Sequence, residues 1–235
     1  MRLTKIGSFY QLSFMPRFFP VNCYIVEEET SLTLVDAALP YSAKGIMKMV
    51  KKLEKPIKHI VLTHAHEDHI GAVDVLKGFL PDVPVYISER DARLLGGDVS
   101  IDLEEAQKPV KGGVPKKMKT RPDILLKEGD RIGSLEAIYS PGHTPGSMSF
   151  IDRRNRSLIA GDAFQTRGGM AVSGTVKPFF PFPALATWDK QTAIDSAKNL
   201  HSLRPSILAV GHGKMLEQPM KAIERAIMDA EKKMK

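Results

Sequence analysis

Residues 59–69 of the chain read HIVLTHAHEDH, an apolar run followed at once by a cluster of metal-ligand side chains. His64, His66, Asp68 and His69 fall within six residues. Imidazole nitrogens and carboxylate oxygens are the usual ligands of catalytic zinc. Ligands on one helix face would recur every four residues, so the tighter spacing indicates a loop whose side chains reach two neighbouring metals.

Three more ligand-type residues follow short apolar runs further along the chain. We interpret each run, like the one before His64, as a buried strand. In layered α/β proteins the loops at the carboxyl ends of strands meet at one edge of the sheet, and functional sites assemble there. We therefore expect all four loops to lie together. The three runs and their residues are 135–139 with His143, 158–160 with Asp162, and 207–210 with His212.

The order and separations of these seven residues resemble the metal-binding pattern of the metallo-β-lactamase superfamily. The match extends over nearly the whole chain. The resemblance implies an α/β fold, a four-layer αββα sandwich with a dinuclear metal site at one edge. It also implies three roles: His64, His66 and His143 hold the first metal, Asp68, His69 and His212 hold the second, and Asp162 bridges the two.

The same resemblance implies a metal-dependent hydrolase, similar to lactonases and glyoxalase II, with a bridging hydroxide on two zinc ions as the nucleophile. Its substrate would be a small ester, lactone or thioester, and Asp68 would act both as ligand and as catalytic proton acceptor or donor. The ligand types leave iron or manganese open. Two other functions stay open: a mononuclear iron persulfide dioxygenase and, favoured only by charge, a nucleic-acid phosphodiesterase.

Length and composition indicate a globular chain of ordinary make-up. The 235 residues fit a single domain over residues 1–235, with 43% hydrophobic and 26% charged residues. No apolar run reaches the roughly 18 residues of a membrane-spanning helix, and the N-terminus lacks the apolar core of a signal peptide. The single cysteine, Cys23, excludes an internal disulfide and suits a reducing compartment, so we expect a cytoplasmic protein.

The chain is basic, with a net charge of +7 and a pI of about 9.4. Much of the excess lies in residues 108–121, a stretch that also contains glycine and proline. Such charge is typical of proteins that bind nucleic acid or anionic substrates, but also of a solvated lysine-rich surface. One tryptophan and no interleaving of arginine with aromatic residues disfavour a nucleic-acid partner. We expect a small-molecule substrate and leave the oligomeric state open.

Hydrophobic periodicity predicts an alternation of strands and helices along the chain. The predicted strands cover residues 2–14, 22–28, 31–36, 58–63, 83–87, 131–139, 146–152, 157–161 and 206–210. The predicted helices cover residues 42–54, 69–80, 88–95, 187–203 and 217–233. Residues 97–121 show the least regular pattern, and we expect a loop there.

Two further stretches bear on the predicted site. Asp36 ends the apolar run 32–35 and is either an outer partner of a metal-bound histidine or a turn residue. Residues 176–185, VKPFFPFPAL, are aromatic and stiffened by proline. They form either a wall or lid for an apolar part of the substrate or a packed surface loop. The residues that could form an opposite wall are Phe14, Met15, Phe18 and Phe19.

Overall fold

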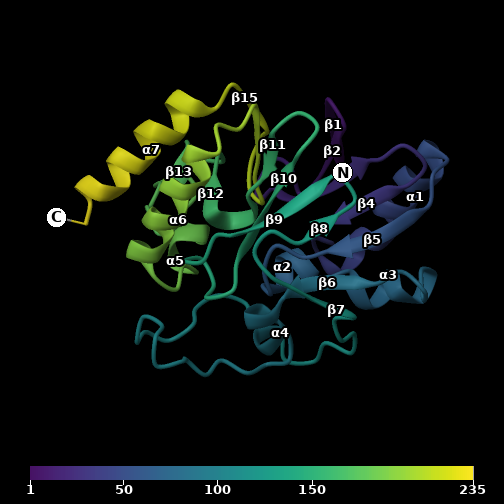
Figure 1. Cartoon of the computed structure of the whole chain (residues 1–235), viewed down its shortest axis with the longest axis horizontal. Helices are drawn as coiled ribbons and strands as arrows, with labels where there is room; N and C mark the ends of the chain where they lie inside the picture. Colours follow the sequence, from purple (N-terminus) through teal and green to yellow (C-terminus); the bar gives the residue numbers. More distant parts are fainter. Residues whose placement is uncertain (235) are drawn as a thin grey trace.

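Two β-sheets stacked face to face form the centre of the molecule, and helices cover the outer face of each sheet (Figure 1). The computed structural model describes residues 1–234. The helices α1 (Ala43–Leu53) and α3 (Val73–Phe79) cover the first sheet, and α6 (Lys190–Ser202) and α7 (Met220–Lys232) cover the second. The predicted four-layer αββα sandwich is confirmed.

The first sheet has seven strands whose order in space follows their order in the chain. They are β1 (Arg2–Ile6), β2 (Phe9–Phe14), β3 (Val21–Glu27), β4 (Leu32–Val35), β5 (Ile57–Val61), β6 (Val85–Ser88) and β7 (Ile124–Leu126). Neighbours are antiparallel from β1 to β4 and parallel from β4 to β7. The carboxyl ends of β4, β5 and β6 therefore share one edge.

The second sheet has six strands in the order β15-β14-β11-β10-β9-β8. They are β8 (Arg131–Ile132), β9 (Leu135–Tyr139), β10 (Met148–Asp152), β11 (Ser157–Ile159), β14 (Ile207–Ala209) and β15 (Leu216–Glu217). Because β11 and β14 run parallel, their carboxyl ends lie side by side. A separate hairpin is formed by β12 (Phe164–Gln165) and β13 (Ala171–Val172).

An apolar core fills the space between the two sheets. Phe9 and Tyr24 enter it from the first sheet and Phe150 and Ile159 from the second, all almost completely buried. Two further apolar clusters lie between each sheet and its helices. Cys23 lies in β3 with no exposed surface, and burial raises the pKa of its thiol, so this residue serves packing.

Glycines turn two of the predicted strands into hairpins. The predicted strand 2–14 turns back at Gly7, and the predicted strand 131–139 turns back at Gly133. Both glycines have a left-handed φ, +55° and +58°, which costs glycine little. The short strands β7, β12, β13 and β15 had no predicted counterpart. Hydrophobic alternation over two or three residues is too short to be detected in a sequence.

The predicted helix 69–80 is wrong in its extent, because two short helices replace it. α2 (Glu67–Ile70) begins inside the histidine cluster, and α3 follows after a break at Gly71 and Ala72. Ala72 has φ −92° and ψ 0°, outside the helical range. Gly71 packs so closely on Pro40 that a Cβ there would lie 2.7 Å from the proline ring. Glycine's low helix propensity and this contact favour the break.

The remaining helices agree with the sequence more closely. α4 (Glu89–Leu95) follows β6 nearly as predicted, whereas α6 and α7 begin three residues later than predicted. Asp189 caps α6 by accepting a hydrogen bond from the amide of Thr192 at 2.8 Å, which fixes its first turn. The short elements η1 (Pro40–Ser42), η2 (Gly161–Ala163) and α5 (Phe182–Leu185) had no predicted counterpart.

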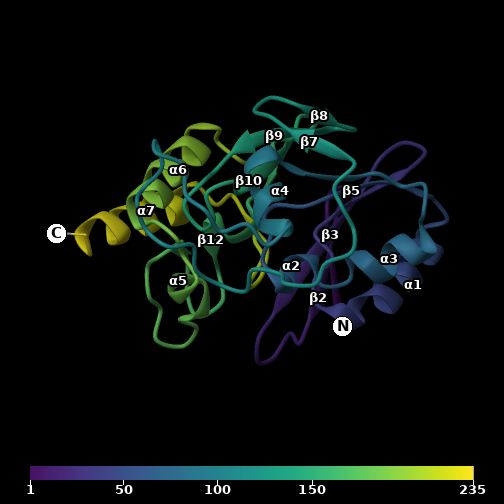
Figure 2. The same cartoon turned by 90° about the horizontal axis from the view of Figure 1, so that it is seen from below.

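The long loop 97–121 joins the two halves of the molecule across one edge of the sandwich (Figures 1 and 2). Lys108 reaches the second half, where its ammonium lies 2.6 Å from Asp189 and its carbonyl accepts a hydrogen bond from the Trp188 indole. The loop then returns to the first half, where the Gly113 carbonyl accepts from the amide of Glu67 at 2.8 Å. The predicted loop is present, and its middle part contacts both halves of the molecule.

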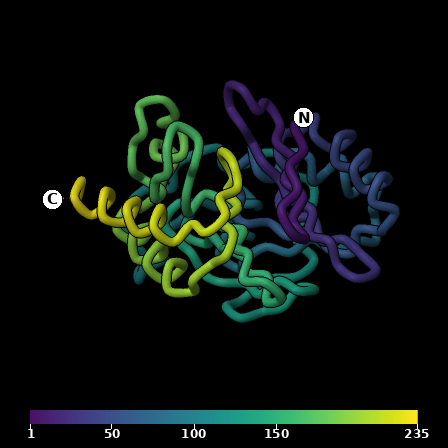
Figure 3. The backbone as a smooth tube through the Cα atoms, turned by 90° about the horizontal axis from the view of Figure 1, so that it is seen from above, coloured from purple at the N-terminus to yellow at the C-terminus, as the bar shows by residue number. Residues whose placement is uncertain are grey.

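Two loops protrude side by side from another part of the surface, the turn between β2 and β3 and the segment before α5 (Figure 3). They touch through Phe19 and Phe180, whose ring centroids are 5.1 Å apart. Within residues 1–234, no helix is long and apolar enough to cross a membrane.

Candidate metal centre

The seven predicted ligand residues lie together at the edge of the sandwich where β5, β9, β11 and β14 end. His64 and His66 lie in the loop after β5, and Asp68 and His69 lie on the first turn of α2. Asp162 lies in η2, directly after β11. His143 and His212 follow β9 and β14, and they complete the set.

A first group of three ligand-type nitrogens comes from His64, His66 and His143, all buried. One ring nitrogen of each lies within 4.8 Å of the others. His66 Nδ1 and His143 Nε2 are 3.0 Å apart. Three imidazoles converging at this separation match the ligand set that holds one zinc in three-histidine sites.

A second group comes from Asp68, His69 and His212, whose ligand-type atoms also lie within 4.8 Å of one another. His212 Nε2 is 3.4 Å from Asp68 Oδ2. Asp68 is the least buried of the three, with 29% of its side chain exposed. Two imidazoles and one carboxylate form a mixed nitrogen and oxygen set.

Asp162 lies between the two groups. Its Oδ2 is 3.4 Å from His143 Nε2 in the first group and 3.2 Å from His212 Nε2 in the second. Its Oδ1 is 3.4 Å from His69 Nε2. One buried carboxylate therefore faces both sets of ligand atoms.

Each of the five histidines has its other ring nitrogen held by the protein. A metal-binding imidazole commonly has such an outer partner, which fixes the ring and its tautomer. Three buried atoms that face inward, His64 Nε2, His69 Nε2 and Asp162 Oδ1, have no hydrogen-bond partner among the described residues. The five outer contacts are His64 Nδ1 with Thr63 Oγ1 (3.0 Å), His66 Nε2 with the Lys111 carbonyl (2.8 Å), His69 Nδ1 with Asp36 Oδ2 (2.8 Å), His143 Nδ1 with Ser173 Oγ (3.0 Å) and His212 Nδ1 with the Pro20 carbonyl (2.7 Å).

The two groups differ in electrostatics. Burial lowers the pKa of His64 and of His66, and it lowers the pKa of His143 to about 3, so the first group is neutral. Burial would also lower the pKa of His212, but the Asp162 carboxylate raises it to about 10. The pKa of His69 is raised in the same way by Asp162 and Asp36. The second group thus holds protons between carboxylates, where a cation can replace them.

A cavity of about 380 Å³ opens onto the two groups. The metal-ligand side of this site cavity includes Asp68 and Asp162, and an apolar side includes Phe19, Phe182 and Leu185. Phe19 and Phe182 lie on the same side, with ring centroids 5.0 Å apart.

The aromatic segment 176–185 contributes partly to the cavity wall and partly to packing. The prediction of a second wall opposite it is wrong. Phe182 lines the cavity, whereas Phe180 is 1% exposed and packs against the His212 ring at 5.4 Å. Phe179 is 89% exposed. Of the four residues predicted to form an opposite wall, only Phe19 lines the cavity, and it packs on the predicted lid rather than across from it.

Residues 16–212 match the model of one known family, the metallo-β-lactamase superfamily. The chain belongs to this superfamily. The resemblance carried by the histidine and aspartate pattern is confirmed, and so is the fold that it implied.

Two relatives from one bacterium and one solved structure each match more than four fifths of the chain. The chain is 57% identical to the uncharacterized protein YobT of Bacillus subtilis (strain 168) over 232 residues, 99% of this chain and 100% of YobT. It is 33% identical to the probable metallo-hydrolase YflN of the same strain over 215 residues, 82% and 80% of the two chains. The crystal structure of TTHA1623 in a di-iron-bound form is 26% identical with a TM-score of 0.67, covering 90% of this chain and 96% of that one.

Asp91, a buried residue of α4 that the sequence did not single out, connects two ligand loops of this superfamily member. Its carboxylate accepts hydrogen bonds from the amide of Ala65, between two candidate ligands, and from Thr144 Oγ1 and the amide of Gly146 beside His143. Burial raises the pKa of Asp91 to about 6, against the opposing effect of these hydrogen bonds. An aspartate in the first turn of a predicted helix carries no signal for such a role.

The sequence also gave no sign that loop 97–121 reaches the candidate metal centre. The Lys111 carbonyl accepts a hydrogen bond from His66 Nε2, and Gly112 lies against the same ring with φ +89°. A Cβ at Gly112 would overlap the His66 ring. The loop therefore fixes the orientation of one candidate ligand through its backbone.

Asp36 is the outer partner that the sequence suggested, and its removal should weaken metal binding. It accepts hydrogen bonds from His69 Nδ1, from the Thr63 amide at 2.8 Å and from Thr63 Oγ1 at 2.9 Å. We expect Asp36→Ala to lower zinc affinity at the second group about 10–100-fold, because the His69 ring loses its fixed orientation. Competition with a chromophoric chelator measures this affinity. Asp229→Ala, on the surface of α7, is the control, and equal affinities in the two variants would contradict the positioning role.

Phe180 and Phe182 should respond differently to truncation. Phe180→Ala should lower the free energy of unfolding by about 3–5 kcal/mol, because a buried phenylalanine is lost. Phe182→Ala, at a half-exposed position, should leave the melting temperature nearly unchanged but raise KM for substrates with an apolar group. A thermal melt beside steady-state kinetics checks both. A large loss of stability in Phe182→Ala would show that this side chain is core rather than cavity wall.

Proposed function

We propose that this protein is a zinc-dependent hydrolase that cleaves a small ester, lactone or thioester with two metal ions held at the candidate metal centre. One observation carries the proposal: two groups of three ligand atoms face a single buried carboxylate, Asp162, that lies within 3.4 Å of both. Membership of the superfamily supports a metal-dependent hydrolase, and the likeness to the probable metallo-hydrolase YflN does so too.

The residues fit two divalent cations well. Inward-facing His64 Nε2, His69 Nε2 and Asp162 Oδ1 are buried without hydrogen-bond partners in the described part of the chain, and a cation would satisfy them. In our proposal His64, His66 and His143 hold the first cation, Asp68, His69 and His212 hold the second, and Asp162 bridges them. Nitrogen and oxygen ligands of this kind suit zinc first, with iron and manganese as alternatives.

Water is the proposed nucleophile. Two divalent cations, when bound by these residues, would supply Lewis acidity toward the substrate carbonyl and a water of lowered pKa. The side chains that line the site cavity include no serine, cysteine or tyrosine, so the chain's described residues offer no hydroxyl or thiol for covalent attack there.

Asp68 is the residue that we propose to move the proton. It is the most exposed of the seven candidate ligands and lies at the wall of the site cavity. The charges of His69 and His212 hold its pKa below the usual range, against the effect of burial, so its carboxylate is ionised at neutral pH. From this position it can pass the proton to the leaving group.

The surroundings favour a small, partly apolar substrate over nucleic acid. The site cavity is apolar along Phe19, Phe182 and Leu185, a surface that suits a hydrocarbon group. In the lysine-rich loop, Lys108 is already paired with Asp189, and the backbone of Lys111 is engaged by His66. Lys108 and Lys111 thus take part in structural contacts, Lys108 through its charge and Lys111 through its backbone.

Metal analysis coupled to a substrate panel tests the proposal. We expect close to two zinc ions per chain, and hydrolysis of at least one ester, lactone or thioester that a chelator abolishes and zinc restores. Phosphodiesters should stay uncleaved. One iron without zinc, together with oxygen consumption on a persulfide substrate, would replace the proposed function with that of a dioxygenase.

A further inference from the structure

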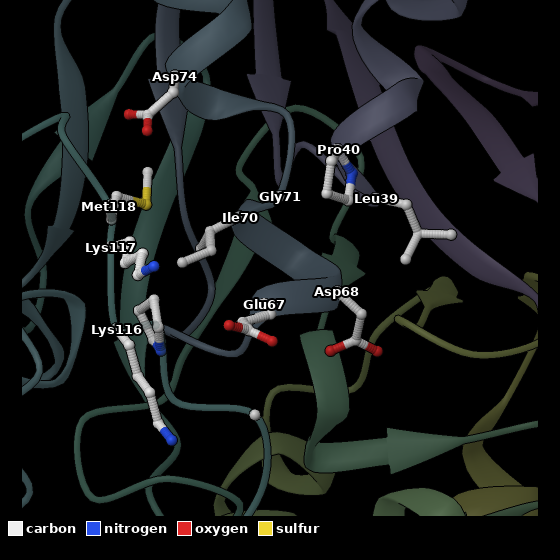
Figure 4. Close-up of a pocket in the computed structure, with 12 residues that line it drawn as sticks. Leu39, Pro40, Glu67, Asp68, Ile70, Gly71, Asp74, Lys116, Lys117 and Met118 are labelled. Atoms are coloured by element: carbon white, nitrogen blue, oxygen red, sulfur yellow. The ribbon is translucent and has the colours of Figure 1, made fainter.

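A second cavity, of about 500 Å³, lies on the outer side of α2, and we call it the α2 pocket. Figure 4 shows Ile70 at its centre, Leu39 and Pro40 on one side and the segment 116–118 on the other. Its size lies within the range of about 300–1,000 Å³ that is typical of cavities for small ligands. The mechanism proposed above leaves this cavity without a role.

The α2 pocket is the neighbour of the site cavity. Asp68 and Gly113 line both cavities, so the proposed proton-moving carboxylate lies at the boundary between the two spaces. In Figure 4 the carboxylates of Glu67 and Asp68 lie side by side at one end of the pocket. A substrate group that extends from the metal centre past Asp68 would therefore reach the α2 pocket.

One wall of the α2 pocket is rigid. At Gly71, a Cβ would lie 2.7 Å from Pro40 and 2.8 Å from the Ala38 carbonyl, so the loop after β4 is pressed onto the helix backbone. Ala38 also forms a parallel bridge with Ile70. This close packing holds Leu39, Pro40 and Ile70 in fixed positions, so the wall exists before any ligand arrives.

The other wall is anchored to α3. The Asp74 carboxylate accepts hydrogen bonds from Thr120 Oγ1 at 2.6 Å, from the Thr120 amide at 2.8 Å and from the Lys119 amide at 3.1 Å. These contacts hold the end of loop 97–121 next to the helix and place Met118 against the core. The flexible thioether of methionine adapts to different apolar groups, which suits a pocket wall.

The charges around the α2 pocket do not favour either sign of ligand. Lys116 and Lys117 stand on one side, Glu67 and Asp68 on another, and within residues 1–234 neither lysine forms an ion pair. The Asp74 carboxylate is already engaged by three donors. A cationic or anionic arm would meet a like charge, whereas an uncharged apolar arm would cover Leu39, Ile70 and Met118.

We propose that the α2 pocket binds an uncharged aliphatic arm of the substrate, on the side of the scissile bond that faces away from Phe19 and Phe182. The substrate class is then an ester or thioester with a hydrocarbon chain that reaches past Asp68 and over Ile70. This inference rests on the proposed hydrolase function and narrows its substrate.

Chain-length series on the zinc-loaded protein test the inference. One series varies a straight acyl chain from two to ten carbons on a constant thiol, and the other varies the alcohol of an acetate ester. We expect kcat/KM to rise about fourfold for each methylene buried in one of the two series, until the pocket is full. Hydrolysis without any dependence on length in either series would overturn the inference and leave the proposed function standing. No hydrolysis of any ester or thioester would refute the proposed function itself.

A filling variant gives an independent check. Met118→Trp should occupy the α2 pocket and abolish the rise in kcat/KM with chain length. Met228→Trp, on the exposed surface of α7, is the matched control and should keep the full rise. A rise that persists in Met118→Trp would contradict the assignment of the arm to this pocket.

A binding measurement tests the α2 pocket without relying on substrate turnover. With methionine methyl groups labelled with carbon-13, octan-1-ol should shift the Met118 signal of the zinc-loaded protein in a saturable way and leave the Met228 signal in place. Shifts of equal size at both methionines, or at neither, would count against a built apolar site.

Discussion

Asp162→Ala should abolish the proposed hydrolysis while leaving most of the folded structure in place. The carboxylate lies within 3.4 Å of histidines in both ligand groups. Its negative charge would offset the repulsion between two neighbouring cations. Without it, we expect about one metal per chain instead of two and a fall in kcat/KM of about a thousandfold or more, equivalent to roughly 4 kcal/mol.

A control variant distinguishes the loss of the proposed metal bridge from the destabilisation that removal of any buried carboxylate causes. Asp152 is also completely buried, and it is paired with Arg154 at 2.6 Å in β10, away from the metal centre. Asp152→Ala should lower the melting temperature but keep two metals. Elemental analysis that finds two metals in Asp162→Ala, together with the original rate, would refute the bridging role.

Gly112→Ala should weaken metal binding at the first ligand group, although residue 112 offers no ligand atom. A Cβ at this position would overlap the His66 ring, and its φ of +89° is strained for any residue with a side chain. The ring must move, and the hydrogen bond from His66 Nε2 to the Lys111 carbonyl is lost with it. Loss of an outer partner of this kind lowers metal affinity about 10–100-fold.

The neighbouring glycine is the matched control. A Cβ at Gly113 would lie 3.6 Å from the Glu67 side chain, an ordinary contact, so Gly113→Ala should keep the original zinc affinity. Zinc titrations of both variants, with circular dichroism to confirm their folds, decide the matter. Equal affinities in the two variants would show that loop 97–121 merely passes over His66.

The candidate ligands were predictable because their signal is local in the sequence. The cluster from His64 to His69 falls in one short stretch, and each later ligand follows an apolar run that does form a strand, as with β9 before His143. In this fold the loops after the strands meet at one edge of the sheets. The location of the candidate site at that edge could therefore be predicted from the sequence pattern alone.

The outer partners of the histidines could not be read in the same way. Three of the contacts involve Pro20, Lys111 and Ser173, which are distant in sequence from the rings that they hold. Two of these partners act through a backbone carbonyl, which every residue has, so the side chain carries no signal. The role of Asp36 could be predicted, because a carboxylate at the end of a strand is a common hydrogen-bond partner of a metal-bound imidazole.

The aromatic segment shows a third kind of limit. Phe179, Phe180 and Phe182 lie within four residues, yet one is exposed, one is buried and one lines a cavity. Prolines and a short helix turn the chain at each step, so no single periodicity relates the three side chains. Composition predicts that such a stretch contacts something apolar, but not which residue contacts what.

The distribution of the ligands over both halves of the sandwich links metal supply to the persistence of the fold. His64, His66, Asp68 and His69 come from the half that carries the first sheet, and the other three ligands come from the half that carries the second. A cation shared by the two halves acts as a removable cross-link, and it stabilises the folded state by about 2.7 kcal/mol when its free concentration is 100 times Kd. If the proposed zinc ions bind there, loss of zinc should therefore lower the stability of the folded protein and shorten its lifetime, besides abolishing the proposed hydrolysis.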